Sequence, residues 1–209
     1  MITLPRFYPI LDSFCFSGTE GLLGAAIQLT RSGVQIVQYR NKSGDAARML
    51  VEARELRQLF LYSEGTSTTK LIMNDRADLC LAAEFDGVHV GQDDLSPESA
   101  RKIVGADRWL GVSTHNPEQV REAVTTSADY IAIGPVFGTV SKANPDPVVG
   151  LEGVRAARRL TKLPLVAIGG ITRENCRPVI EAGADSVAVI SDLIREPGKS
   201  AEEFLRILG

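Results

Sequence analysis

The stretch Gly87–Asp94, with the sequence GVHVGQDD, has the pattern of a short buried strand that stops at a turn. Its acidic residues follow the apolar run at once, so they lie at the carboxyl end of the predicted strand. The segment Leu71–Arg76, LIMNDR, shows the same pattern earlier in the chain. Neighbouring parallel strands that each end in a carboxylate can bring both carboxylates to one point, and we expect a site there.

Short apolar runs of this kind recur along the chain, each followed by a polar or glycine-containing turn and then by a helical pattern. They are nearly continuously apolar, which is typical of parallel strands covered by helices. The predicted strands are Phe7–Asp12, Ile36–Arg40, Leu71–Asp75, Gly87–Gly91, Trp109–Thr114, Tyr130–Pro135, Leu165–Gly170 and Ser186–Ser191. The predicted helices are Glu20–Arg31, Ala46–Tyr62, Ala77–Glu84, Pro97–Val104, one beginning at Asn116–Pro117, Leu151–Leu160, Arg173–Ala182 and Ala201–Leu208.

Eight strand–helix units in 209 residues predict a single (β/α)8 TIM barrel that spans residues 1–209 as one domain. The length suits one sizeable core and is short for two domains. The alternative is a doubly wound open sheet. That fold is disfavoured because no GxGxxG motif follows the first predicted strand.

The composition is that of an ordinary globular protein, with 44% apolar and 23% charged residues. A net charge of −3 excludes a broad polyanion-binding surface, so we expect no nucleic-acid partner. The cysteines, Cys15, Cys80 and Cys176, form no CxxC pair, which indicates a reduced, intracellular protein. Neither a signal-peptide pattern nor a membrane-length apolar run is present, so we expect a cytoplasmic protein without a membrane partner. Whether the protein forms a homo-oligomer is not determined by the sequence.

In a TIM barrel, active-site residues come from the carboxyl ends of the strands and the loops that follow. The second predicted strand places Gln38 and Arg40 on one face, with Lys42 just beyond. An arginine fork and a lysine point charge suit a phosphate or diphosphate. The alternative is a solvated loop in which Arg40 pairs with an acid.

The third and fourth strands end in Asp75 and in Asp93–Asp94. An oxygen-only pair, Asp75 with Asp94, suits Mg²⁺ rather than zinc, because Mg²⁺ prefers carboxylates, waters and substrate phosphate oxygens. Asp93 can instead cap the turn or the helix that begins at Pro97. The residues alone barely separate Asp93 from Asp94.

The fifth strand ends in Ser113, Thr114 and His115. The hydroxyls can bond a phosphate, and His115 is either a general base or a cap of the helix that begins near Pro117. His89 lies within a predicted strand and is expected to be packed and hydrogen-bonded rather than catalytic.

The loops after the last strands carry further candidates. The long segment Val136–Gly150 contains Thr139, Ser141 and Lys142, which suit an anion, and its glycines and prolines suggest a lid. Gly170 allows close approach of a phosphate, and Ser191 begins the next helix. The strand ends therefore carry two anion sites, which predicts two phosphorylated substrates or one bisphosphate.

Several motifs in this order resemble thiamine-phosphate synthase from about Tyr8 to Ser191. They are QYRNK at 38–42, NDR at 74–76, GVHVGQDD at 87–94, GVSTH at 111–115, GPVFGT at 134–139 and AIGGI at 167–171. The resemblance implies a (β/α)8 barrel and a Mg²⁺-dependent transferase. Such an enzyme joins 4-amino-5-hydroxymethyl-2-methylpyrimidine diphosphate to a thiazole phosphate, giving thiamine phosphate and pyrophosphate.

The resemblance also implies residue roles, motif by motif. The pyrimidine diphosphate would be held by Gln38, Tyr39, Arg40, Asn41, Lys42, Asn74, Ser113 and Lys142, of which Arg40, Lys42, Ser113 and Lys142 would be catalytic. The thiazole phosphate would be held by Thr139, Ser141, Gly170, Ile190 and Ser191. Asp75 and Asp94 would bind Mg²⁺, which selects Asp94 over Asp93. Ser141 departs from the family pattern, in which a second threonine is common.

The implied chemistry agrees with this inventory. An electron-rich aminopyrimidine expels diphosphate, and the thiazole nitrogen captures the methyl cation, so charge stabilisation and positioning suffice without a general base. One alternative is a thiazole tautomerase on the same barrel, with His115 as catalyst. Another is a non-catalytic regulator that binds thiazole phosphate and releases no pyrophosphate.

Overall fold

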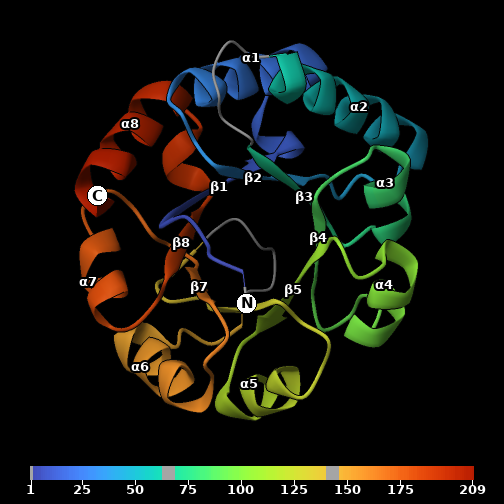
Figure 1. Cartoon of the computed structure of the whole chain (residues 1–209). Helices are drawn as coiled ribbons and strands as arrows, with labels where there is room; N and C mark the ends of the chain where they lie inside the picture. The colour runs from blue at the N-terminus through green and yellow to red at the C-terminus, as the bar shows by residue number, and fades with distance from the viewer. Residues whose placement is uncertain (1, 63–68, 140–145) are drawn as a thin grey trace.

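The strands of the protein close into a barrel in a computed structural model that describes residues 2–62, 69–139 and 146–209 (Figure 1). All neighbouring pairs are parallel and follow chain order, and the last strand pairs with the first, with Tyr8 opposite Ala188. This closure confirms the predicted TIM barrel and excludes the open sheet. The strands are β1 Phe7–Asp12, β2 Ile36–Arg40, β3 Lys70–Asn74, β4 Gly87–Val90, β5 Trp109–Thr114, β6 Tyr130–Ile133, β7 Leu165–Ile168 and β8 Ser186–Val189.

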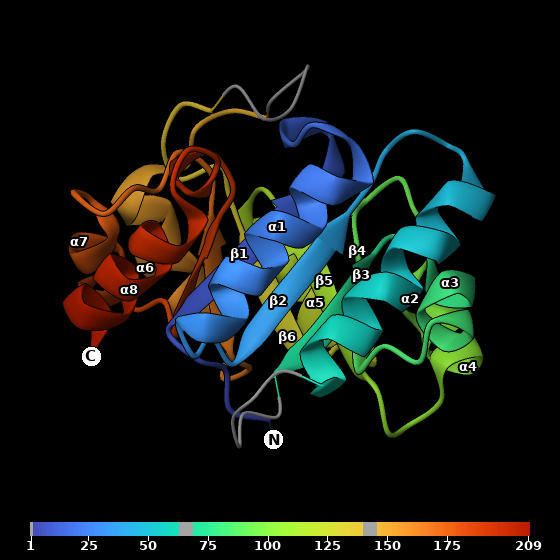
Figure 2. The ribbon, with the colours of Figure 1, turned by 90° about the horizontal axis from the view of Figure 1, so that it is seen from above.

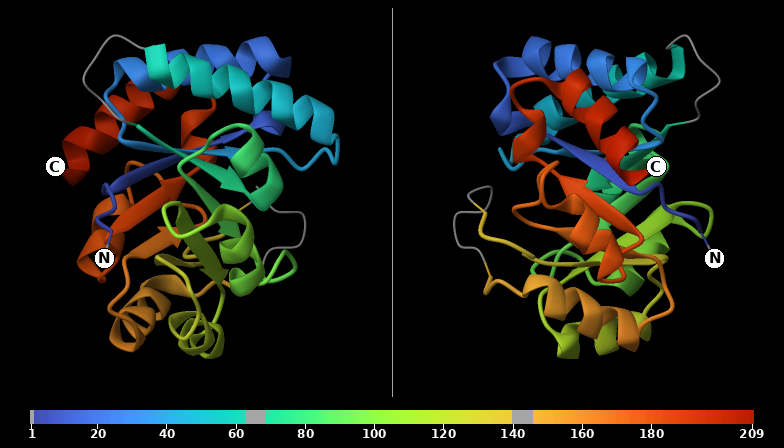
Figure 3. Two further views of the ribbon diagram at one scale, coloured as in Figure 1. Left: turned by 45° about the vertical axis from the view of Figure 1, so that its right-hand side comes forward. Right: turned by 90° about the vertical axis from the view of Figure 1, so that its left-hand side faces the viewer.

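A ring of helices surrounds the barrel, and α8 lies beside α1, where the ring closes (Figures 1 and 3). The α-helices are α1 Gly18–Arg31, α2 Ala46–Tyr62, α3 Ala77–Ala82, α4 Pro97–Val104, α5 Pro117–Val124, α6 Gly150–Leu160, α7 Cys176–Glu181 and α8 Pro197–Leu208. Short 3-10 helices follow the first and last strands, η1 Ser13–Cys15 and η2 Ser191–Leu193. Among the helices of the described segments, none is both long and apolar enough to cross a bilayer.

Two predicted helix starts differ from the structure by three or more residues, for local reasons. Helix α7 begins at Cys176 rather than Arg173, because the Asn175 side chain closes a turn by accepting from the Thr172 N–H at 2.8 Å. Helix α8 begins before the predicted Ala201, at Pro197, whose missing N–H costs nothing in a first helical turn. The predicted bounds of α2 and α4 are confirmed.

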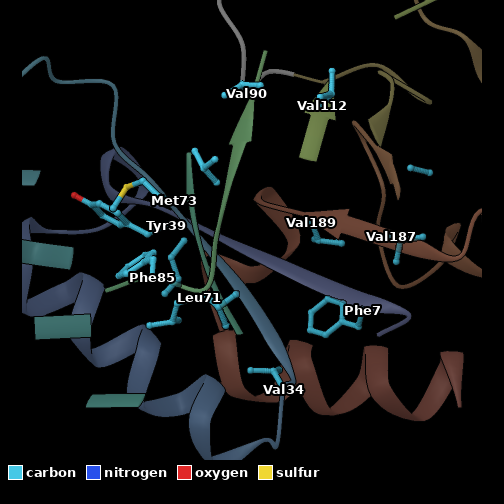
Figure 4. Packing of buried hydrophobic residues seen from close by; sticks show 14 of the residues in the cluster. Phe7, Val34, Tyr39, Leu71, Met73, Phe85, Val90, Val112, Val187 and Val189 are labelled. Carbon is cyan, nitrogen blue, oxygen red and sulfur yellow. The ribbon is translucent and has the colours of Figure 1, made fainter. Parts of the chain in front are cut away.

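The strands separate two apolar layers, because successive side chains alternate between the barrel interior and the helix ring. Figure 4 shows part of the outer layer, including Phe7, Tyr39 and Leu71. Phe7 stacks on Phe204 of α8 with ring centroids 4.7 Å apart. The inner layer consists of Leu4, Tyr8, Ile10, Ile36, Ile72, Tyr130, Ala132, Val166 and Ala188.

In Figure 2 the loops after the carboxyl ends of the strands lie at the top, and the N terminus lies at the bottom. At the amino end of the barrel a carboxylate recurs immediately before β4, β6 and β8. Each accepts a hydrogen bond from an N–H near the start of the preceding strand and from an arginine of the helix before that strand. The three sets are Asp86 with Leu71 and Arg57, Asp129 with Leu110 and Arg101, and Asp185 with Leu165 and Arg158.

Loss of one such carboxylate is expected to destabilise the barrel. Asp129→Ala leaves the Leu110 N–H and the Arg101 guanidinium, now 2.8 and 2.6 Å from Oδ2, without their shared acceptor. We expect the free energy of unfolding to fall by about 1.5–3 kcal/mol, measured by urea denaturation, since the lost bonds involve a charged group. The control is Asp107→Ala in an exposed loop. Equal stability of the two variants would contradict the role of Asp129.

Candidate active site

A cavity of about 490 Å³ opens at the carboxyl ends of the strands. This is the end of a TIM barrel at which active sites lie. The predicted site residues that line it are Gln38, Arg40, Lys42, Asn74, Asp75, Asp94, Ser113, Thr139, Gly170, Ile190 and Ser191. Ser141 and Lys142 lie outside the described residues. The structure therefore brings most of the predicted set to one cavity.

Tyr39 and Asn41 do not line that cavity, so we do not retain their side chains as substrate ligands. The Tyr39 hydroxyl donates to Glu52 Oε2 at 2.6 Å, and Asn41 Nδ2 donates to the same oxygen at 3.0 Å. The reason is the period of the strand. With Gln38 and Arg40 directed inward, the residues between and after them face the helix ring.

The sequence reasoning missed Glu52, a carboxylate of α2 that is 1% exposed. Burial raises its pKa, but hydrogen bonds from Tyr39, Arg48 and Asn41 outweigh burial and hold the pKa below its ordinary value. The Asn41 Oδ1 atom in turn accepts from the Ser43 N–H, which fixes the turn that carries Lys42. The sequence does contain a sign of this buried carboxylate. Glu52 lies one helical turn from the apolar residues Met49 and Leu56, on the apolar face of the predicted helix.

Arg40 satisfies both interpretations that the sequence left open. It lines the cavity, and its NH1 group forms an ion pair with Asp12 Oδ2, the residue opposite it in the β1–β2 register. Asp12 is 3% exposed and also accepts from the Phe14 N–H. Asp12 was missed, although it ends a predicted strand in a carboxylate as Asp75 does. Its charge holds the Arg40 fork at the cavity wall.

The predicted carboxylate pair faces one point. Asp75 and Asp94 are within hydrogen-bonding reach of each other, and Lys42 Nζ lies 2.5 Å from Asp75 Oδ2. Burial and the neighbouring Asp94 raise the pKa of Asp75 to about 6, against the opposing effect of Lys42. Asp94 is fixed by the Gly91 N–H, which donates to its Oδ2 at 2.8 Å. Asp93 is exposed at the cavity mouth.

The backbone at Asp75 is strained. Its φ of 62° lies in the left-handed region, which a residue with a side chain seldom occupies. A 2.7 Å hydrogen bond from the Asp75 N–H to the His89 carbonyl holds the turn. Next to it, the buried Asn74 Nδ2 has no hydrogen-bond partner among the described residues, so it is left for a ligand acceptor.

His115 does not cap the following helix, so that interpretation is wrong. The cap is Asn116, whose side chain accepts from the Gln119 N–H at 2.9 Å. His115 instead places Nδ1 2.6 Å from the Gly134 carbonyl and Nε2 3.5 Å from Asp146 Oδ2, a residue of the β6–α6 loop. The interpretation of His89 as packed and hydrogen-bonded is confirmed: burial lowers its pKa to about 4.

Gly170 lies where the β7 and β6 loops meet. Its φ is 63°, and a Cβ there would stand 2.4 Å from the Gly138 carbonyl oxygen. Only glycine allows the two loops to approach this closely.

A cationic clamp, also missed from the sequence, ties the β7 loop to η2 and α8. Arg173 donates to both oxygens of Asp192 at 3.0 Å and to Glu203 at 2.5 Å. Gly170 and Ser191 are thereby fixed relative to each other. No local pattern marks Arg173, because its partners come from other elements.

An eightfold barrel whose strand-end cavity combines a carboxylate pair, cations and hydroxyls is the architecture of a TIM-barrel enzyme that holds anionic small molecules.

The comparisons with known proteins identify the family. The family model described as thiamine monophosphate synthase matches residues 7–193. A thiamine-phosphate synthase of Koribacter versatilis (strain Ellin345) is 58% identical over 211 residues, covering 99% of this chain and 97% of the relative. A thiamine-phosphate synthase of Methanosarcina mazei is 37% identical over 204 residues, covering 97% of this chain and 82% of the relative. The chain belongs to the thiamine monophosphate synthase family and is a transferase of that family.

Solved structures agree with this assignment. The thiamine phosphate pyrophosphorylase from Pyrococcus furiosus superposes with a TM-score of 0.84 at 32% identity, covering 97% of this chain and 95% of that one. A mutant tryptophan synthase alpha-subunit from the same organism reaches a TM-score of 0.70 at 14% identity, which shows the shared fold alone.

Proposed function

We propose that this chain joins 4-amino-5-hydroxymethyl-2-methylpyrimidine diphosphate to a thiazole phosphate in the cytoplasm and releases pyrophosphate. The observation that carries the proposal is the group formed by Asp75, Asp94 and Lys42 at one wall of the cavity, with Arg40 beside it. A carboxylate pair next to two cations is suited to a leaving diphosphate, whereas a reaction that moves only a proton has no diphosphate charge to neutralise.

The pyrimidine diphosphate is assigned to the side of the cavity formed by β2 to β5. Arg40 and Lys42 supply positive charge for the diphosphate oxygens, and the unpartnered Asn74 Nδ2 supplies a further donor. Gln38 and Ser113, which line the same side of the cavity, are assigned to orient the ring. Lys142, outside the described residues, stays a predicted diphosphate ligand.

The thiazole phosphate is assigned to the other side, formed by the loops after β6 to β8. Thr139 and Ser191 offer hydroxyls, Gly170 offers an approachable backbone, and Ile190 offers an apolar surface for the ring. The clamp formed by Arg173 supports this assignment, because it fixes the spacing of the two loops. Ser141 stays a predicted ligand.

Asp75 and Asp94 fit a Mg²⁺ ion. Among the described residues no group of three or more histidine, cysteine or acidic side chains converges, so the protein offers a carboxylate pair and leaves other ligand positions to water and phosphate, as Mg²⁺ prefers. Burial, together with the neighbouring Asp94, raises the pKa of Asp75, and a cation bound between the two carboxylates would stabilise their charged forms. When bound, Mg²⁺ supplies positive charge to the diphosphate as it departs.

The chain's own groups account for the rest of the chemistry. The bond from the pyrimidine methylene carbon to the diphosphate oxygen breaks, and the electron pair leaves with the oxygen, toward Arg40 and Lys42. The lone pair of the thiazole nitrogen then forms the new carbon–nitrogen bond. That nitrogen carries no proton, so no general base is needed. The barrel contributes by positioning both rings and by stabilising the leaving charge.

A coupled pyrophosphate assay with both substrates and Mg²⁺ tests the proposal. We expect one pyrophosphate released per thiamine phosphate formed, and none when either substrate is omitted. Binding of thiazole phosphate without pyrophosphate release would support the non-catalytic regulator instead. Isomerisation of a thiazole substrate alone would support the tautomerase.

Mg²⁺ affinity is expected to rise as the pH increases through about 6, the pKa of Asp75. Below that pH a proton and the cation compete for the same carboxylate, so each pH unit lowers affinity by up to about tenfold. Calorimetric titration with MgCl₂ between about pH 5 and pH 8 measures this profile. Asp75→Asn should abolish the step near pH 6, and a flat profile in the unmodified protein would refute the assignment.

A further inference from the structure

A continuous chain of hydrogen bonds crosses the barrel interior beneath the cavity. Gln38 Nε2 donates to the Tyr8 hydroxyl at 3.1 Å, and that hydroxyl lies 3.0 Å from the Tyr130 hydroxyl. The Tyr130 hydroxyl lies 3.1 Å from His89 Nδ1, and His89 Nε2 lies 2.8 Å from Ser113 Oγ. The two ends, Gln38 and Ser113, line the cavity, as do Tyr8 and His89, whereas Tyr130 does not. We refer to these five side chains as the barrel relay.

The direction of every bond in the barrel relay follows from its first donor. Because the Gln38 amide nitrogen can only donate, Tyr8 accepts there and gives its own proton to Tyr130. Tyr130 then gives its proton to His89 Nδ1. A neutral histidine that accepts at Nδ1 carries its proton on Nε2, which donates to Ser113.

Burial makes this order costly to break. Tyr8 is 1% and Tyr130 is 0% exposed, so a hydroxyl left without its partner would lose a hydrogen bond and gain no water. Burial also raises the pKa of both tyrosines and lowers that of His89, so all three side chains stay neutral. The relay can therefore reverse only as a whole, by rotation of the Gln38 amide.

We propose that the barrel relay couples the hydrogen-bond polarity of its two ends, with His89 as a positioning residue that makes Ser113 a donor whenever Gln38 presents its carbonyl oxygen to the cavity. In this state Ser113 Oγ accepts from His89, so its own proton points to the ligand. The carbonyl oxygen of Gln38 is likewise left for the ligand, since the relay uses the amide nitrogen.

The coupled ends select a ligand that offers a donor to Gln38 and an acceptor to Ser113. An aminopyrimidine diphosphate offers both, through its amino group and through its phosphate oxygens. This identification of the ligand rests on the proposed function. A 4-oxo analogue lacks the amino donor, so Gln38 must turn its amide toward it, which reverses the relay and makes Ser113 an acceptor. The phosphate oxygens of the oxo compound still need a donor, which the reversed Ser113 no longer supplies, so the relay discriminates against the oxo compound at both ends.

The histidine tautomer tests the relay without any substrate. The chain has two histidines, His89 and His115, so ¹⁵N-histidine labelling with a His115→Gln variant assigns both rings. A long-range ¹H–¹⁵N correlation spectrum at neutral pH should show His89 with a protonated Nε2 and an unprotonated Nδ1. An imidazolium, or a proton on Nδ1, would overturn the proposal whether or not the protein releases pyrophosphate.

Tyr130→Phe tests the coupling, because it deletes the middle hydroxyl without altering the cavity lining. The variant should lose the single His89 tautomer and show both neutral forms. The matched control is Tyr39→Phe, which removes an equally buried hydroxyl that bonds Glu52 in the helix ring. It should leave the His89 nitrogen signals unchanged. Equal disturbance of His89 by both variants would overturn the proposal.

Ligand discrimination gives the final measurement. Calorimetry should show that the unmodified protein binds the 4-oxo pyrimidine diphosphate about 10²-fold or more weakly than the 4-amino compound. In Tyr130→Phe the ends are uncoupled, so this ratio should fall about five- to tenfold, the worth of one hydrogen bond. Tyr39→Phe should keep the ratio. An undiminished ratio in a folded Tyr130→Phe protein would overturn the coupling.

Discussion

Asp75→Asn and Asp94→Asn are each expected to lower kcat/KM for thiamine phosphate formation by about 10²–10³-fold. Either change keeps the shape of the side chain and removes one of the two negative charges that face each other beside Lys42. The diphosphate would then depart without the Mg²⁺ that we propose for the pair. Initial rates with saturating Mg²⁺ and both substrates give the effect, and thermal unfolding verifies that the variants fold.

The neighbouring residue provides the control for this prediction. Asp93→Asn removes an equal charge from the position next to Asp94. Asp93 is exposed at the cavity mouth and has no assigned part in holding Mg²⁺. We expect a loss of less than about threefold, the scale of a screened surface charge. His115→Ala should also be milder than Asp94→Asn. A greater loss at His115 than at Asp94 would favour the tautomerase reaction.

Gly111→Ala is expected to cost about 3 kcal/mol in the free energy of unfolding, at the upper end for overpacking of a core. A Cβ at this position would stand 2.1 Å from Tyr130 Cζ and 2.4 Å from His89 Nδ1. The Tyr130 ring is 0% exposed and packed on all sides, so it cannot withdraw without displacing its neighbours. At about 2–4 °C per kcal/mol for a chain of this size, the melting temperature should fall by about 6–12 °C.

Calorimetric melting of Gly111→Ala beside Gly24→Ala separates this clash from a general effect of alanine. Gly24 lies inside helix α1, with no atom within 4 Å of its added Cβ. Alanine there should stabilise the protein by up to about 1 kcal/mol, because glycine is a poor helix former. If Gly111→Ala and the unmodified protein have the same melting temperature, the barrel interior can accommodate the extra methyl group and the predicted clash is wrong.

The fold could be predicted because its signals are local. Each strand is an apolar run bounded by turn residues, and each helix has its own apolar face, so neither requires knowledge of distant contacts. The strand ends were less well predicted. Strands β6, β7 and β8 stop at Ile133, Ile168 and Val189, before the residues predicted as their ends, because the backbone there turns away to form the cavity rim.

Alternation within a strand also settled part of the site. It placed Gln38 and Arg40 on one face, and the structure has both at the cavity. The roles given to Tyr39 and Asn41 came from the family motif, which names a continuous stretch and ignores alternation. Their side chains face Glu52 instead. Where motif and strand period disagree, the period decides where a side chain points.

The sequence by itself determined the barrel, the end at which the site lies, and the carboxylates and cations that gather there. The family motif already chose Asp94 over Asp93, and the structure turns Asp94 toward Asp75. Only the tertiary structure paired Arg40 with Asp12 and joined Tyr8 to Tyr130 across 122 positions of the chain. The physical reason is closure of the sheet. Strand-end residues are specified by their own neighbours in sequence, whereas partners across the interior meet only when β8 reaches β1 and the barrel is complete.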